Sequence, residues 1–220
     1  MTEDRRASSG RPRPRKPTLA ERRERRGTVE DVAEVLDSGA RFLEARPRST
    51  EEVRRKLVRL GYRPDLVEAA ITRLQDLRYL DDDAFARAWI ESRDRVRPRG
   101  EYALRRELAL KGVERALVDT VLEDRRELAH GDGTAAGDEE PQSPDDTAAE
   151  RLLQRKLPTL LREPDPRRRR QRAYGLLARS GFSPDICSAA FCTRVRFSFS
   201  ISGMTMFRPG ICWRRTTLAS

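Results

Sequence analysis

The spacing of hydrophobic and polar positions along this chain is helical over most of its length. Apolar residues recur on one face at intervals of three and four, as at Val32, Val35, Leu36 and Leu43. The same spacing returns twice further along the chain. It predicts helices at roughly Val29–Ala45, Asp83–Val96 and Asp146–Leu161.

Each of these helices precedes a segment that the chain repeats three times. When Gly61, Gly112 and Gly181 are placed in register, five further columns are apolar in all three copies. In a chain that is 37% hydrophobic, this agreement indicates a true internal repeat. The columns are Leu57, Leu108 and Leu177; Tyr62, Val113 and Phe182; Leu66, Leu117 and Ile186; Val67, Val118 and Cys187; Ile71, Leu122 and Phe191.

Local signals around the glycines predict a helix, a left-handed stop and a second helix. Glycine adopts the left-handed conformation that closes a helix without opposition from a side chain. Pro64 and Pro184 are placed for a first helical turn. Upstream, Ser49 and Glu52 form a capping-box pattern, and Gly100 takes the aligned N-cap position in the second copy.

Each repeat therefore has three helices, and units of this size cannot bury their apolar faces alone. We expect an all-α fold in which three tandem units stack into an elongated, curved molecule. The expected parts are a disordered basic arm (1–28), repeat 1 (29–80), repeat 2 (81–129), an acidic flexible linker (130–147), repeat 3 (148–191) and an atypical tail (192–220).

The sequence "DDDAFARAW" starts the second repeat. Asp81, Asp82 and Asp83 invite a metal-site interpretation, but carboxylates here are better explained as an N-terminal cap reinforced by the helix dipole. Behind them, one apolar stripe is expected at Ala84, Phe85, Ala88 and Trp89. No metal site is therefore predicted.

The formal net charge of +10 is unevenly distributed along the chain. It is +6 over residues 1–28, −1 over 29–129, −6 over 130–147 and +11 over 148–220. Basic ends favour polyanions, nucleic acid first, although a solvated tail also explains such runs.

Catalysis is not indicated. The single histidine, His130, falls in the expected linker, which cannot hold a general base against a substrate. No phosphate loop, nucleophile elbow or zinc-protease motif occurs, and no catalytic residue or cofactor is predicted. The N-terminus has no apolar signal region, and no long apolar run occurs. The three cysteines all lie in the last 34 residues and form no disulfide or zinc pattern. A soluble, cytoplasmic monomer that does not bind membranes is expected.

Binding is the remaining interpretation, and the helices that end at the glycines carry arginine-rich polar faces. The alternative is that these faces are merely exposed to solvent and that their charges pair within the helix, as Glu51 and Arg55 would at i,i+4 spacing. The alternative is weaker for the run "RRRRQR". The candidate contact residues are Arg54, Arg55, Arg59, Arg105, Arg106, Lys111, Arg168, Arg169, Arg170, Arg172 and Arg179, and Lys56 belongs to the same basic face of the first copy.

The stretches "ARPRSTEEVRRKLVRLGY", "ITRLQDLRYLDDDAFARAWIESR" and "RGEYALRRELALKGV" resemble the RecX family, the bacterial regulators of the RecA recombinase. The resemblance is strong over residues 40–123 and weaker over the third repeat. It implies a tandem three-helix protein that lodges in the groove of the RecA–DNA filament and suppresses filament extension, ATP hydrolysis, strand exchange and coprotease activity. Alternatives are an architectural protein that binds DNA without sequence preference and a scaffold for another acidic partner.

The end of the chain departs from the repeat. After Ala190 helical periodicity is lost, and Val195, Phe197, Phe199 and Ile201 alternate as in a strand. A frameshifted terminus explains this change in composition better than a designed element.

Overall fold

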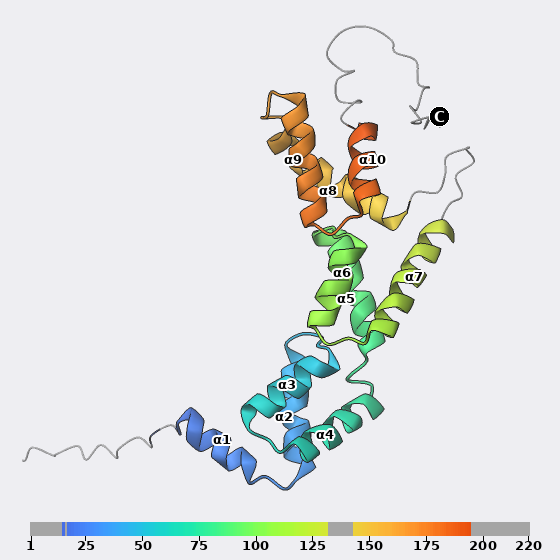
Figure 1. Cartoon of the computed structure of the whole chain (residues 1–220). Coiled ribbons are helices and arrows are strands. Elements are labelled where there is room, and N and C mark those ends of the chain that lie inside the picture. Colours follow the sequence, from blue (N-terminus) through green and yellow to red (C-terminus); the bar gives the residue numbers. More distant parts are fainter. Residues whose placement is uncertain (1–14, 16, 132–142, 195–220) are drawn as a thin grey trace, which may run out of the picture. The chain divides into compact units, whose positions relative to one another are not determined.

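A computed structural model describes residues 15, 17–131 and 143–194, and this part of the chain is helical without any strand (Figure 1). The prediction of an all-α fold is confirmed. The helices are α1 (Leu19–Gly27), α2 (Val32–Glu44), α3 (Thr50–Leu60), α4 (Pro64–Asp76), α5 (Asp82–Val96), α6 (Glu101–Leu110), α7 (Arg115–Gly131), α8 (Pro144–Leu160), α9 (Pro166–Arg179) and α10 (Pro184–Arg194).

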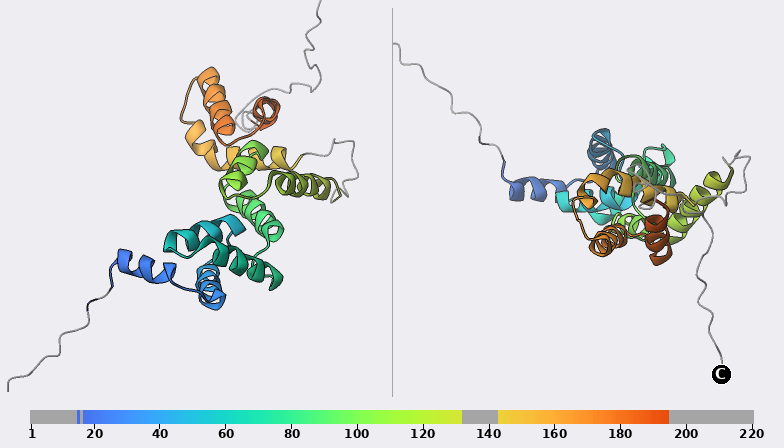
Figure 2. Two further views of the ribbon diagram at one scale, coloured as in Figure 1. Left: turned by 60° about the horizontal axis from the view of Figure 1, so that its bottom comes forward. Right: turned by 90° about the horizontal axis from the view of Figure 1, so that it is seen from above.

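The helices after α1 form three successive triplets, which appear from further directions in Figure 2. Two compact units are present: residues up to Arg95 with Leu104–Glu127, and Val96–Ala103 with the described residues from Leu128 onward. The first unit holds two apolar cores, around Leu57 and around Leu108. The second unit holds one, around Leu177.

Positions that the sequence alignment of the three repeats places in one column are mostly buried in the corresponding cores. The leucine four residues before each glycine is fully buried in all three copies. In the column six residues after the glycine, Val67, Val118 and Cys187 are 0%, 3% and 1% exposed. The column five residues after the glycine is looser, because Leu117 and Ile186 are half-buried where Leu66 is buried.

All three aligned glycines have left-handed backbone, with φ of 103° at Gly61, 78° at Gly112 and 85° at Gly181. The helix stops are therefore confirmed. Pro64 and Pro184 each begin the helix that follows, also as predicted.

Each glycine turn also packs against a helix that comes earlier in the chain. A Cβ atom at Gly112 would overlap the side chain of Glu51 on α3, and one at Gly181 would overlap Ala103 on α6. Hydrogen bonds fix these contacts: the Ser49 hydroxyl donates to the Lys111 carbonyl at 2.6 Å, and the Gly100 amide donates to the Ser180 carbonyl at 3.0 Å. Glycine is thus required by close approach as well as by backbone conformation.

The N-terminal arm needs a correction. Residues 1–28 were expected to lack structure, but Leu19–Gly27 form α1. A capping box between Thr18 and Glu21 starts this helix, and Arg23 lies against Gly61 in place of an earlier repeat. No residue of α1 is buried, so it contributes no side chain to the apolar core of repeat 1. The rest of the arm, residues 1–14 and 16, lies outside the described residues.

The start of α5 follows the capping interpretation. The Asp81 carboxylate accepts a hydrogen bond from the Ala84 amide at 3.0 Å, and Asp82 accepts one from the Thr50 amide at 2.8 Å. The expected apolar stripe is wrong in part, because Ala84 and Ala88 are exposed. The buried face is rotated by one position and consists of Phe85, Ala86 and Ile90, with Trp89 half-buried.

The boundaries around the acidic segment also differ from the expectation. Helix α7 continues to Gly131, so the backbone of His130 is helical and does not belong to a linker. Helix α8 begins at Pro144 behind a capping box of Ser143 and Asp146. Residues 132–142 lie outside the described residues.

The C-terminal helix is longer than expected. Helix α10 runs to Arg194, four residues beyond the point where periodicity was expected to end. The alternating segment from Val195 to Ile201, and with it the question of a frameshifted tail, lies outside the described residues.

Candidate functional site

The expected basic face of α3 divides into two groups. Arg54 is engaged in ion pairs, at 2.6 Å from Glu51 and 2.7 Å from Glu68 on α4. The hydrogen bonds from Arg54 hold the pKa of both carboxyl groups below their usual range. Arg54 therefore joins two helices of repeat 1 and is poorly available to a partner.

The remaining cations of α3 border a hollow of about 430 Å³ between α2, α3 and the end of α6. We call it the basic hollow. Five of its eight lining residues are cationic and one is acidic. The lining consists of Phe42, Arg48, Glu52, Arg55, Lys56, Arg59, Leu110 and Lys111.

Two of these cations have acidic partners. Arg55 lies 2.7 Å from Glu51, which confirms the i,i+4 pair expected from the sequence. Lys111 lies 2.7 Å from Glu52 and places its ammonium 4.9 Å from the centre of the Trp89 ring. Burial works to raise the pKa of Glu52, but the hydrogen bond from Lys111 and the charges of Lys111 and Arg46 hold it below its usual value.

The other three cations have no acidic partner within ion-pair distance in the described chain. Arg48 lies over the Phe42 ring with its guanidinium carbon 4.2 Å from the ring centre, and Lys56 lies 5.5 Å from the same centre. The Nε atom of Arg48 is buried and has no hydrogen-bond partner among the described residues. Arg59 is exposed at the edge of the hollow.

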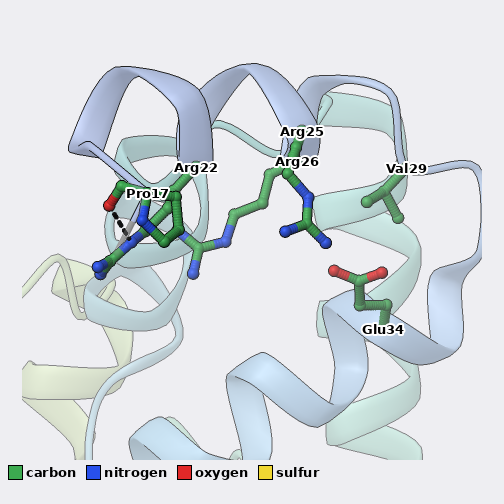
Figure 3. Close-up of a pocket in the computed structure, with 6 residues that line it drawn as sticks. All are labelled: Pro17, Arg22, Arg25, Arg26, Val29 and Glu34. Atoms are coloured by element: carbon green, nitrogen blue, oxygen red, sulfur yellow. Dashed lines mark hydrogen bonds between the residues drawn. The ribbon is translucent and has the colours of Figure 1, made fainter. Parts of the chain in front are cut away.

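A second hollow, of about 300 Å³, lies where α1 meets α2. Figure 3 shows Arg22, Arg25 and Arg26 of α1 on one side and Glu34 of α2 on the other. The Arg22 Nε donates to the Pro17 carbonyl at 3.0 Å, so this arginine is partly engaged by the segment that precedes α1.

The arginines expected on α6 do not join the basic hollow. Arg105 lies 3.0 Å from Asp119 of α7 and joins two helices of repeat 2. Arg106 is exposed.

The arginine run of α9 has one member that points inward. Arg169 is 9% exposed, and its Nε and Nη2 atoms donate to the Glu163 carbonyl at 3.1 and 2.8 Å. The expectation that Arg169 is a surface contact is therefore corrected: it closes the loop between α8 and α9. Arg172 lies 2.9 Å from Glu163, while Arg168, Arg170 and Arg179 are exposed.

Arg48 is the cation of the lining that sequence reasoning did not select. It directly precedes the N-cap Ser49 and lies in the quoted "RPRS" stretch, so its position was visible. That it lines the same hollow as Lys111 was not visible, because this depends on how two repeats pack.

Comparison with known proteins gives three matches in chain order. Family models for the first, second and third three-helix domains of RecX match residues 36–74, 81–122 and 145–191. The chain belongs to the RecX family. The resemblance of the quoted motifs is thus confirmed, and the three matched domains coincide with the three helix triplets.

Curated RecX relatives agree in sequence. The regulatory protein RecX of Mycobacterium avium is 32% identical over 146 residues, which cover 66% of this chain and 76% of the relative. That of Streptomyces coelicolor is 32% identical over 65% of this chain and 68% of the relative. The RecX of Prosthecochloris aestuarii is 39% identical over 43% of this chain, and the match spans under two thirds, 62%, of that relative.

Solved RecX structures share the fold. The crystal structure of RecX from Lactobacillus salivarius has a TM-score of 0.60 at 17% identity, covering 74% of this chain and 96% of that one. A second crystal structure of a regulatory protein RecX has a TM-score of 0.59 at 19% identity and covers 72% of each chain.

Among the described residues, no cluster of histidine, cysteine, aspartate or glutamate has the arrangement of a metal site. Within the same residues, each helix is too short or too polar to cross a membrane. Cys187 is a free thiol buried in the third core, and burial raises its pKa.

Proposed function

We propose that this chain binds the RecA–DNA filament and modulates it, mostly by inhibiting recombinase, ATPase and coprotease activity. The observation that carries the proposal is the ordered match of three RecX domains to three helix triplets. The relatives are named regulatory proteins, which agrees with a role in binding and not in catalysis.

The physical basis of the proposal is repetition. A filament presents the same surface at regular intervals, and a protein built from like units can contact several of them at once. Each further contact is then effectively intramolecular, so many weak contacts add to strong and filament-dependent binding. The exposed arginines of α3, α6 and α9 supply the charge for such contacts. In this proposal the chain acts as a monomer in the cytoplasm.

The test is the rate of ATP hydrolysis by RecA on single-stranded DNA, with this protein added below the concentration of RecA. We expect hydrolysis to fall, because one bound molecule blocks extension of a whole filament. A rate that stays unchanged up to equimolar protein would reject the proposal.

The alternative is an architectural protein that binds DNA without RecA, and the unpartnered cations of the basic hollow favour it. This alternative requires tight and salt-dependent binding to naked duplex DNA. Co-sedimentation with RecA filaments separates the two functions: a filament modulator sediments with RecA–DNA under salt conditions at which it no longer binds naked DNA.

A further inference from the structure

We propose that the basic hollow is a binding site for a backbone phosphate of a nucleic-acid strand. The proposal deepens the proposed function, because it assigns contact with the DNA of the filament to repeat 1. It can nevertheless be tested without RecA.

Charge is the first argument. Five cations line the basic hollow, and its single carboxylate, Glu52, is already bonded to Lys111 and Arg46. Arg48, Lys56 and Arg59 retain positive charge that no carboxylate of the described chain neutralises at ion-pair distance. Such a cluster is unfavourable by itself, and a bound anion relieves the mutual repulsion of the cations.

Preorganisation is the second argument. Arg48 is held against Phe42, Arg55 is held by Glu51, and Lys111 is held between Glu52 and Trp89. Side chains that are already ordered lose little entropy when a ligand binds. The buried Arg48 Nε without a partner is costly, and an oxyanion in the hollow offers an acceptor for this guanidinium.

The choice of a phosphate, and not of a nucleobase, follows from the aromatic ring. Phe42 is the aromatic residue in the lining, and Arg48 already covers one of its faces while Lys56 approaches the ring. Base stacking would have to displace these cations. Guanidinium groups instead match the two oxygens of a phosphodiester, so binding at this site does not depend on base sequence.

The experiment compares two charge-matched double variants of the full chain. Lys56→Gln with Arg59→Gln removes two cations from the basic hollow. The control, Arg73→Gln with Arg151→Gln, removes two exposed arginines of α4 and α8 that have no acidic partner at ion-pair distance in the described chain. Far-UV circular dichroism establishes that both variants keep the helix content of the unaltered protein.

Binding is measured by fluorescence anisotropy with a labelled oligothymidylate over a series of salt concentrations. We expect the hollow variant to bind roughly tenfold more weakly, with the slope of log K against log salt reduced by about 0.7 for each phosphate contact that is lost. The control variant should keep the slope of the unaltered protein. Equal losses in both variants, or an unchanged slope in the hollow variant, would overturn the site.

A competition arm separates nucleic acid from an acidic protein partner. Poly-glutamate should displace the oligonucleotide poorly, because a carboxylate chain does not present tetrahedral phosphates at the same spacing. Loss of poly-glutamate binding without loss of DNA binding in the hollow variant would overturn the proposal. Failure of the RecA hydrolysis assay would reject the proposed function alone, because the anisotropy assay contains no RecA.

Discussion

The hydroxyl of Ser49 joins two repeats: it donates a 2.6 Å hydrogen bond to the carbonyl of Lys111 and accepts one from the Glu52 amide at 3.2 Å. Ser49 is fully buried. Both bonds disappear in Ser49→Ala, which leaves an N-terminal amide of α3 and a carbonyl of the next repeat without this partner. We expect Ser49→Ala to lower the free energy of unfolding by about 2 kcal/mol, measured by urea denaturation.

The matched control is Ser49→Thr, which keeps the hydroxyl and adds one methyl group. Because the site is buried, the added methyl should cost part of the stability, but less than the loss of both hydrogen bonds. A threonine variant less stable than the alanine variant would show that space, and not hydrogen bonding, decides the contact.

Gly112 provides a test of the turn itself. Its φ of 78° disfavours any side chain, and a Cβ atom would overlap Glu51. We expect Gly112→Val to cost at least about 1–2 kcal/mol from the backbone alone, with a further cost from displacing α3. Thermal unfolding followed by circular dichroism measures the loss.

A glycine elsewhere supplies the control for this prediction. Gly175 lies within α9 without positive φ, and a Cβ there meets only the flexible end of Arg179. Gly175→Ala should raise stability by up to about 1 kcal/mol, because alanine favours the helix. Equal destabilisation by both substitutions would contradict the role assigned to the Gly112 turn.

The sequence predicted those features that depend on local rules. Helical spacing located the three triplets, and the aligned glycines located the left-handed turns, because a left-handed stop has a strong residue preference. Two local sequence patterns that predict structure were overlooked. "TLAE" at Thr18 is a capping box that starts α1, and Arg169 lies four and eight residues before the buried Ala173 and Leu177, on the core face of α9.

The basic hollow could not be predicted in the same way. Arg54 and Arg59 share one helix, yet Glu68 of another helix engages only Arg54. Whether a surface arginine is free depends on which carboxylate the packing brings near. That Lys111 and Arg48 line the same hollow likewise depends on the contact between two repeats, for which the sequence has no local signal.

The carboxylates of repeat 1 make stability depend on pH. In the folded chain, hydrogen bonds from Arg54 lower the pKa of Glu51 and Glu68 below the ordinary value near 4.5. A depressed pKa means that the stabilisation is complete above the ordinary value and is lost as pH falls through the folded value. We expect the free energy of unfolding to decline as pH is lowered below the ordinary glutamate value.

Glu51→Gln combined with Glu68→Gln should flatten this decline, because neither position then titrates. Glu30→Gln is the control, since Glu30 is exposed and has no ion-pair partner in the described chain. Urea denaturation at several pH values gives the slopes. If the double variant declines as steeply as the unaltered protein, other groups dominate the acid sensitivity.

Arg169 and Arg168 are adjacent in sequence and opposite in expected effect. Arg169 donates two hydrogen bonds to the Glu163 carbonyl and a longer one, at 3.5 Å, to the Pro164 carbonyl, whereas the side chain of Arg168 is 75% exposed. Arg169→Ala should destabilise repeat 3 by about 2–3 kcal/mol, because the carbonyl of the buried Glu163 loses a charged donor. Arg168→Ala should leave unfolding within about 0.5 kcal/mol of the unaltered protein. Urea denaturation measures both losses, and co-sedimentation with RecA filaments then compares Arg168→Ala with the unaltered protein. If Arg169→Ala were as stable as Arg168→Ala and instead lost filament binding, Arg169 would be a contact residue after all and the assigned loop-closing role would be wrong.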